Sequence, residues 1–157
     1  MNLLLMNVLL ALIWAAMTGS VTPANLAAGF VLAYLALLML QRPGAARAAY
    51  FQKTWKAAAF LAWFAREMAV SNLRVAHDVL TARHMSRPGV VAVPLDCATP
   101  LEITLFANLI TLTPGTLTLD ISGDRRTLYV HAMFIDDPEE LRSALKDGER
   151  RLLELMR

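Results

Sequence analysis

Charged side chains are missing from the first 41 positions of the 157-residue sequence: all 15 Lys and Arg and all 13 Asp and Glu lie at Arg42 or beyond. The same stretch contains no histidine. Proton relays and ion pathways in membranes normally require ionisable side chains within the bilayer. If this stretch lies in a membrane, we therefore expect it to anchor the chain and not to conduct ions.

Motifs of metal, nucleotide and nucleophile chemistry are also missing. His77, His84 and His131 are too far apart for a zinc motif. The acidic cluster at residues 136–140 lacks the oxygen spacing of a calcium loop, and helix capping accounts for it. The single Cys97 can form no internal disulfide and fits a reducing compartment. The sequence predicts no metal, no cofactor and no enzyme activity.

Apolar residues, by contrast, make up 57% of the chain, above the roughly 45–50% of an average soluble protein. Two apolar runs, residues 3–17 and 24–40, flank a connector with the turn formers Gly19 and Pro23. This pattern predicts a transmembrane helical hairpin over residues 1–41. Its helices would span about 22 Å and about 26 Å, against a hydrocarbon core of about 30 Å. We expect neighbouring helices to cover such short spans.

The charge pattern around the runs predicts their orientation. No basic segment precedes the first run, so we expect a retained anchor and not a cleaved signal peptide. The connector is uncharged and bases follow the second run, which predicts that both termini are cytoplasmic. Polar and small residues suited to close helix contact are Asn7, Ala11, Ala15, Thr18, Asn25, Ala27, Ala28, Gly29 and Ala33.

A basic segment follows at residues 42–86, with a long helix expected over residues 50–80 because that stretch holds no Gly or Pro. Its charges share one side, and we expect an apolar face made of Leu61, Phe64, Met68, Val75 and Val79. Such a helix would lie along the headgroups of membrane lipids. An equal alternative is packing on the following domain or on partner subunits, whereas nucleic-acid binding is disfavoured by the preceding hairpin. The predicted lipid contacts are Lys53, Trp55, Lys56, Trp63, Arg66 and Arg74.

Residues 87–157 alternate between strand and helix signals. A strand over 90–94, a helix over 101–112, two strands over 116–122 and 127–134, and a final helix capped by Asp137 give the order β-α-β-β-α. The order resembles part of a ferredoxin-like split βαβ arrangement. The whole chain is predicted to be a membrane α+β protein with a small cytoplasmic domain.

Residues 102–122 and 127–132 closely resemble the small E subunit of the Mrp-type (Mnh/Pha) cation/proton antiporters, and a weaker resemblance extends over the whole chain. The resemblance implies a bacterial inner-membrane complex of about seven different subunits that exchanges Na⁺, or in some cases K⁺, for protons. It also implies that the ion routes lie in the large subunits and that this subunit is accessory, with no catalytic residue. The alternative is a stand-alone, membrane-anchored binding or signalling module.

Within the resembling segment, Thr104, Asn108 and Thr111 recur at helical spacing and form a polar stripe on an apolar helix. We expect this stripe, together with Thr113, Pro114 and Gly115, to contact a partner subunit. An alternative stays open: the hydroxyls bond back to helix carbonyls, and residues 113–115 only end the helix.

Overall fold

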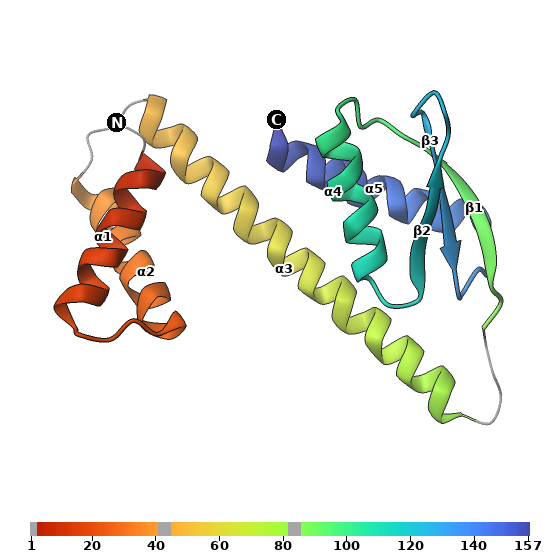
Figure 1. Cartoon of the computed structure of the whole chain (residues 1–157), viewed down its shortest axis with the longest axis horizontal. Helices are drawn as coiled ribbons and strands as arrows, with labels where there is room; N and C mark the ends of the chain where they lie inside the picture. Colours follow the sequence, from red (N-terminus) through yellow and green to blue (C-terminus); the bar gives the residue numbers. More distant parts are fainter. Residues whose placement is uncertain (1–2, 41–44, 82–85) are drawn as a thin grey trace. The chain divides into compact units, whose positions relative to one another are not determined.

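The computed structural model describes residues 3–40, 45–81 and 86–157, which contain five helices and three strands (Figure 1). Arg42 and Arg83, which belong to the basic segment, and the side chain of Arg47 lie outside the described residues. The chain divides into two compact units, Met1–Trp55 and Lys56–Arg157. This division differs from the three parts expected from the charge pattern, because the longest helix belongs partly to each unit.

Two apolar helices, α1 (Leu3–Met17) and α2 (Pro23–Leu40), begin the N-terminal unit and pack against each other. α1 is closed by Gly19, whose φ of 65° lies in the left-handed region that favours glycine. The Ser20 amide then donates to the Ala15 carbonyl at 3.2 Å. Thr22 caps α2, since its side-chain oxygen accepts from the Asn25 amide at 3.2 Å.

The contact between α1 and α2 is made by small residues. A Cβ added to Gly29 would lie 2.8 Å from Cδ1 of Trp14 and 3.1 Å from the Ala11 carbonyl oxygen, so only glycine permits this approach. Ala11, Ala15 and Ala33 are buried, as expected for the contact, whereas Ala27 and Ala28 are exposed. The indole N–H of Trp14 donates to Oδ1 of Asn25 at 3.1 Å and links the two helices near the connector.

The helix α3 (Ala45–Leu80) starts five residues before the expected Tyr50 and runs without interruption for 36 residues. Its first part belongs to the N-terminal unit, where Nδ2 of the fully buried Asn7 donates to the Tyr50 hydroxyl at 2.7 Å. Tyr34 packs edge-on against Phe51 beside this bond, with ring centroids 4.8 Å apart. A partly buried hydrogen bond therefore ties α1 to α3.

The C-terminal unit contains the sheet domain, which we define as Gly89–Met156. Its elements are β1 (Gly89–Pro94), α4 (Pro100–Leu112), β2 (Thr116–Ile121), β3 (Thr127–Ala132) and α5 (Pro138–Met156). The strand order is β1-β3-β2 with both pairs antiparallel, which is the split βαβ topology expected from the order of elements. Each strand lies within two residues of its expected range, and β3 ends earlier than expected, at Ala132.

One face of the sheet carries the core, and α4 and α5 cover it (Figure 1). Val91, Val93, Leu128 and Val130 alternate with exposed positions along the strands and point into this core. The other face is open and apolar. Its large exposed side chains are Val90, Leu117, Leu119 and Tyr129.

Side chains cap both helices of the sheet domain. Asp137 caps α5 as predicted, accepting from the Glu139 amide at 2.8 Å. A reciprocal capping box begins α4, where Thr99 accepts from the Glu102 amide and Glu102 accepts from the Thr99 amide.

The second part of α3 packs on the sheet domain through a face that partly matches the expected one. Phe64, Met68 and Val75 of the predicted apolar face are half-buried, whereas Leu61 and Val79 are exposed and the charged Asp78 is buried. Phe60 packs against the domain core, and the Trp63 ring lies 3.2 Å from the position of a Cβ added to Gly148. The tertiary contact therefore selects a mixed face of α3 and leaves several apolar residues outside.

Candidate functional site

The polar stripe predicted to contact a partner satisfies much of its hydrogen bonding inside α4. The Thr104 hydroxyl donates to the Pro100 carbonyl at 2.8 Å, and the Thr111 hydroxyl donates to the Ala107 carbonyl at 3.0 Å. Both hydroxyl protons are thus bonded to carbonyls of the same helix, which is the alternative to a partner contact. Asn108 lies between them on the exposed side of α4. A partner contact of this stripe stays a prediction, and it rests mainly on the Asn108 amide.

The segment Thr113, Pro114 and Gly115 ends α4 and turns the chain into β2. Gly115 has a φ of 86°, and its carbonyl accepts from the Met133 amide at 2.8 Å. The Thr113 hydroxyl donates to the Leu109 carbonyl at 3.0 Å. All three residues are half-buried, so the segment has a structural role whether or not a partner also touches it.

The six residues predicted to meet lipid headgroups fall into two groups. Lys53, Trp55 and Arg66 are exposed, and Lys56 is exposed with its ammonium 3.5 Å from the Glu154 carbonyl oxygen. Trp63 and Arg74 contact the sheet domain instead. The Arg151 guanidinium lies 5.2 Å from the Trp63 ring, and the Arg74 guanidinium lies 5.8 Å from the ring of Phe134.

A cavity of about 220 Å³, partly open to solvent, lies between α3 and the sheet domain beside their contact. Its walls are mostly apolar side chains of α3, α4, α5 and the segment after β3, and Thr113, Pro114 and Gly115 form part of one wall. Polar atoms come from α3, where Glu67, Ser71 and Arg74 line the same space. The cavity lies wholly within the C-terminal unit.

The side chain of Glu149 on α5 is fully buried and organises the loop after β1. Its Oε1 accepts from the amides of Asp96 and Cys97 at 2.7 and 2.8 Å, and its Oε2 accepts from the Lys146 ammonium at 2.6 Å. Lys146 also pairs with Asp96 at 2.5 Å. Burial lowers the pKa of Lys146, but the bonds to Asp96 and Glu149 outweigh this and leave it raised.

This arrangement makes Cys97 a structural residue. Burial, followed by the bond to the neighbouring Glu149 carboxylate, raises the pKa of the Cys97 thiol to about 12. The thiol therefore stays protonated at neutral pH, which argues against a nucleophilic role. The Cys97 side chain is buried in the core of the sheet domain.

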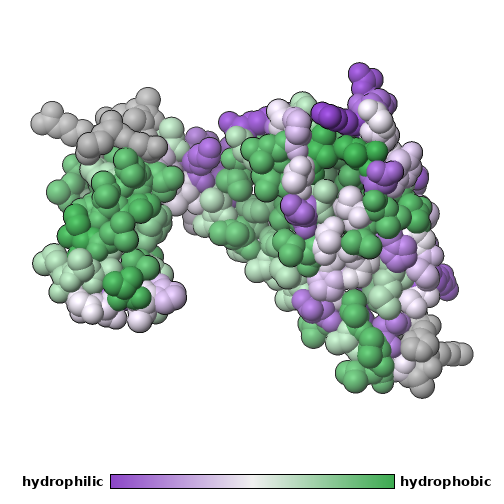
Figure 2. All heavy atoms as spheres, viewed as in Figure 1, coloured by the Kyte–Doolittle hydropathy of each residue, from purple (hydrophilic) through white to green (hydrophobic). Residues whose placement is uncertain are grey.

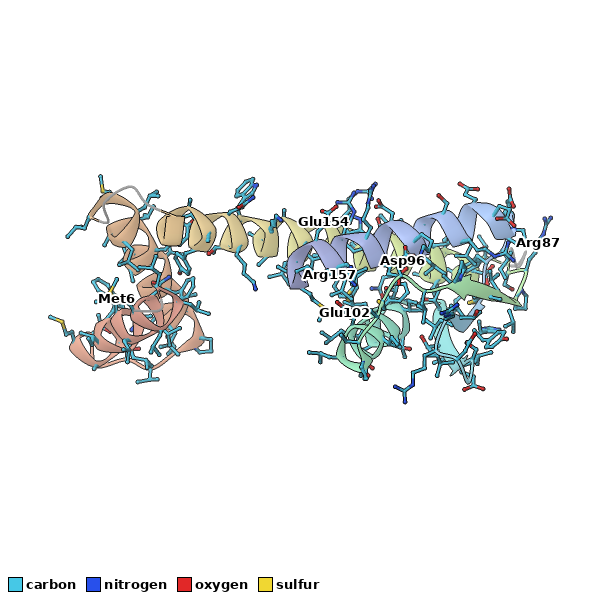
Figure 3. All side chains as sticks on the ribbon, turned by 90° about the horizontal axis from the view of Figure 1, so that it is seen from above. Met6, Arg87, Asp96, Glu102, Glu154 and Arg157 are labelled. Atoms are coloured by element: carbon cyan, nitrogen blue, oxygen red, sulfur yellow. The ribbon has the colours of Figure 1, made fainter. Side chains whose placement is uncertain are left out.

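A second buried carboxylate joins the two helices of the sheet domain. Nε of Arg157, at the end of α5, donates to Oε1 of Glu102 at the start of α4, at 3.1 Å (Figure 3). This bond, together with the Thr99 and Ala98 amides, lowers the pKa of Glu102 to about 2. Glu102 therefore stays ionised over the physiological range.

Sequence reasoning missed both buried carboxylates, although each left a signal. Glu149 is the one acid within the apolar stripe of α5, between Leu145 and Leu152. Thr99 and Glu102 have the spacing of a capping box directly before an apolar run. Within the described ranges, no group of three or more metal-ligating side chains occurs. The chemistry of these carboxylates is structural, and the contact surfaces are the candidates for function.

The matches to known proteins cover nearly the whole chain. The model of a family described as "Na+/H+ ion antiporter subunit" matches residues 7–155. The chain belongs to the E-subunit family of Na⁺/H⁺ antiporters. The antiporter's E subunit in Alkalihalophilus pseudofirmus is 33% identical over 97% of this chain and 96% of its own length. Its counterpart in Bacillus subtilis is 37% identical over 87% of this chain and 86% of its own length.

Solved structures agree with this membership. A chain of the Mrp complex from Dietzia sp. is 36% identical, with a TM-score of 0.51, and covers 64% of this chain and 96% of its own. A chain of an archaeal membrane-bound sulfane sulfur reductase is 25% identical, with a TM-score of 0.58 and 98% coverage of both chains. The matching family consists of antiporter subunits, which are parts of transporters.

Proposed function

We propose that the chain is an accessory, non-conducting membrane subunit of a multisubunit monovalent cation/proton antiporter, where it supports assembly or stability of the complex. The family membership supports the antiporter. The accessory role is inferred from this chain's own residues.

The proposal rests on the packing of α1 and α2, in which small residues are buried and large apolar residues are exposed. The residues buried in these helices are Asn7, Ala11, Ala15, Gly29, Ala33 and Leu37, so all but one are small or polar, while most large apolar side chains face outward. Apolar residues cover most of the visible surface of these helices in Figure 2. Such a surface needs lipid or other apolar helices around it. α2 is the one described helix long and apolar enough to cross a membrane, and α1 is apolar but shorter.

A non-conducting role follows from the same helices. Residues 3–40 contain no acid, no base and no histidine, so they offer no group that takes up and releases a proton near neutral pH. The polar groups in their contact are the amides of Asn7 and Asn25, which hydrogen-bond to other residues of the N-terminal unit. We place both termini in the cytoplasm, because the bases follow α2 and the connector is uncharged.

The exposed basic part of α3 is proposed to meet anionic lipid headgroups at the cytoplasmic side. Lys53, Trp55, Lys56 and Arg66 are exposed and available for this contact. Each such base near an anionic surface contributes about 1 kcal/mol. Trp63 and Arg74 are engaged by the sheet domain, so the lipid proposal does not depend on them.

Purification of the tagged full chain from its own membranes tests the proposal. We expect the large, very hydrophobic antiporter subunits to be recovered with it, and the complex to decline in amount when the chain is deleted. A stable chain recovered alone, with a complex of normal amount in the deletion strain, would support the stand-alone binding module instead.

A further inference from the structure

We infer that the cavity between α3 and the sheet domain receives one large apolar side chain of another antiporter subunit, with an acidic group beside it held by Arg74. The inference rests on the proposed function, because it names how that subunit contact is made. It starts from a pocket of the C-terminal unit that is partly open to solvent.

The volume of the cavity indicates which kind of group fits it. The pocket has a volume of about 220 Å³ and is partly open to solvent, so a side chain of another protein can enter it. An apolar cavity of about 150 Å³ binds one benzene molecule, whereas pockets for drug-sized ligands are about 300–1,000 Å³. The space therefore fits one aromatic or branched side chain better than a cofactor or a whole lipid tail.

The lining favours an apolar occupant. Trp63 and Phe64 approach from α3, Phe106 and Ile110 from α4, and Leu145 from α5. Most of the lining is apolar, and the polar side chains Glu67, Ser71 and Arg74 all lie on the α3 wall. Filling the space would bury apolar area on both sides, which is the property of interface hot spots.

Charge indicates what accompanies the apolar side chain. Arg74 is exposed, lines the cavity and stacks over the Phe134 ring. Asp78 and Asp136 line a neighbouring pocket together with Arg74, but no ion pair between Arg74 and an acid is formed within residues 3–40, 45–81 and 86–157. Glu67, the acid in the same wall, is paired with Arg66 at 2.9 Å. A partner segment that carries a carboxylate next to its apolar side chain would complement the Arg74 cation.

Filling the cavity from within tests the inference. Ser71 is half-buried in the α3 wall, and Ser71→Phe places a ring in the space. The adjacent Asn72 is exposed and does not line the cavity, so Asn72→Phe is a matched control on the same helix. We expect Ser71→Phe to lower recovery of the large subunits with the tagged chain by about tenfold or more, the loss typical of one blocked hot spot. Asn72→Phe should recover them normally.

Folding is monitored by alkylation of Cys97, the single cysteine of the chain, which stays protected while the C-terminal unit is folded. If Ser71→Phe exposes Cys97, the variant is not folded, and Arg74→Glu is used in its place. Arg74→Glu changes an exposed side chain and adds no bulk to the core. Normal recovery with the folded Ser71→Phe variant, or with Arg74→Glu, overturns the inference. Loss of a bound lipid from Ser71→Phe with normal subunit recovery also overturns it. If the unmodified chain recovers no subunits, the proposed function itself fails.

Discussion

Replacing Glu149 should open the sheet domain more than replacing any exposed acid of the same helix. Its carboxylate is the acceptor for the Asp96 and Cys97 amides and for the Lys146 ammonium. Glu149→Leu leaves these donors without that acceptor inside the protein. A buried donor left unpaired costs about 1–3 kcal/mol, and removal of one partner of a buried ion pair costs about 3–5 kcal/mol. Because Lys146 keeps Asp96, we expect a total of about 3–5 kcal/mol.

Two further variants separate the causes of this loss. Glu149→Gln keeps a carbonyl oxygen for the two amides and loses only the charge opposite Lys146, so it should cost about 1–2 kcal/mol. Glu154→Leu lies on the exposed side of α5 and should change stability by less than about 0.5 kcal/mol. The expected order of stability is therefore Glu154→Leu, then Glu149→Gln, then Glu149→Leu.

Alkylation of Cys97 in the full chain, in its native membrane, measures the effect directly. The folded thiol is buried and protonated, so it reacts only when the loop after β1 opens. A loss of about 3–5 kcal/mol should speed labelling on the order of a hundred- to a few thousand-fold. Equal labelling of Glu149→Leu and Glu154→Leu would refute the structural role of the carboxylate.

Other expectations concern the two units separately. Gly29→Leu should separate α1 from α2 at a cost of about 1–3 kcal/mol and lower the amount of chain in the membrane, whereas Ala28→Leu, at an exposed position, should not. Glu102 has a depressed pKa, so its stabilisation is present above the unfolded value of 4.5 and is lost as pH falls toward about 2. Urea unfolding over this range should therefore be less pH-dependent in Glu102→Gln, and an identical pH profile would contradict the pairing. Reversing the charges of Lys53 and Lys56 should reduce crosslinking of the chain to a photoactivatable anionic lipid, and unchanged crosslinking would remove the proposed headgroup contact.

Local signals explain how much of the fold was predictable. The connector with Gly19 and Pro23, the turn before Gly115 and the cap at Asp137 are read from neighbouring residues, and the structure has a helix or strand boundary at or next to each. The alternation of apolar residues likewise predicted the three strands to within two residues. Such features depend on chain segments of a few residues, which the sequence shows directly.

Contacts between distant segments were not predictable in the same way. Asn7 meets Tyr50 across 43 residues, and Glu149 meets the Asp96 amide across 53 residues. The periodicity of α3 predicted only part of its packed face, because Trp63 also packs near Gly148 while Leu61 and Val79 of the predicted face are exposed. The cavity beside Arg74 arises from the same docking, so no pattern within α3 could reveal it.

Antiport by membrane vesicles tests the central claim that this chain supports the transporter without carrying its ions. Na⁺/H⁺ and K⁺/H⁺ exchange are measured with and without the chain and divided by the amount of assembled complex. Deletion should lower the amount of complex while the exchange rate per complex and the Na⁺-to-K⁺ preference stay the same. A changed ion preference in complexes assembled without the chain would contradict the account.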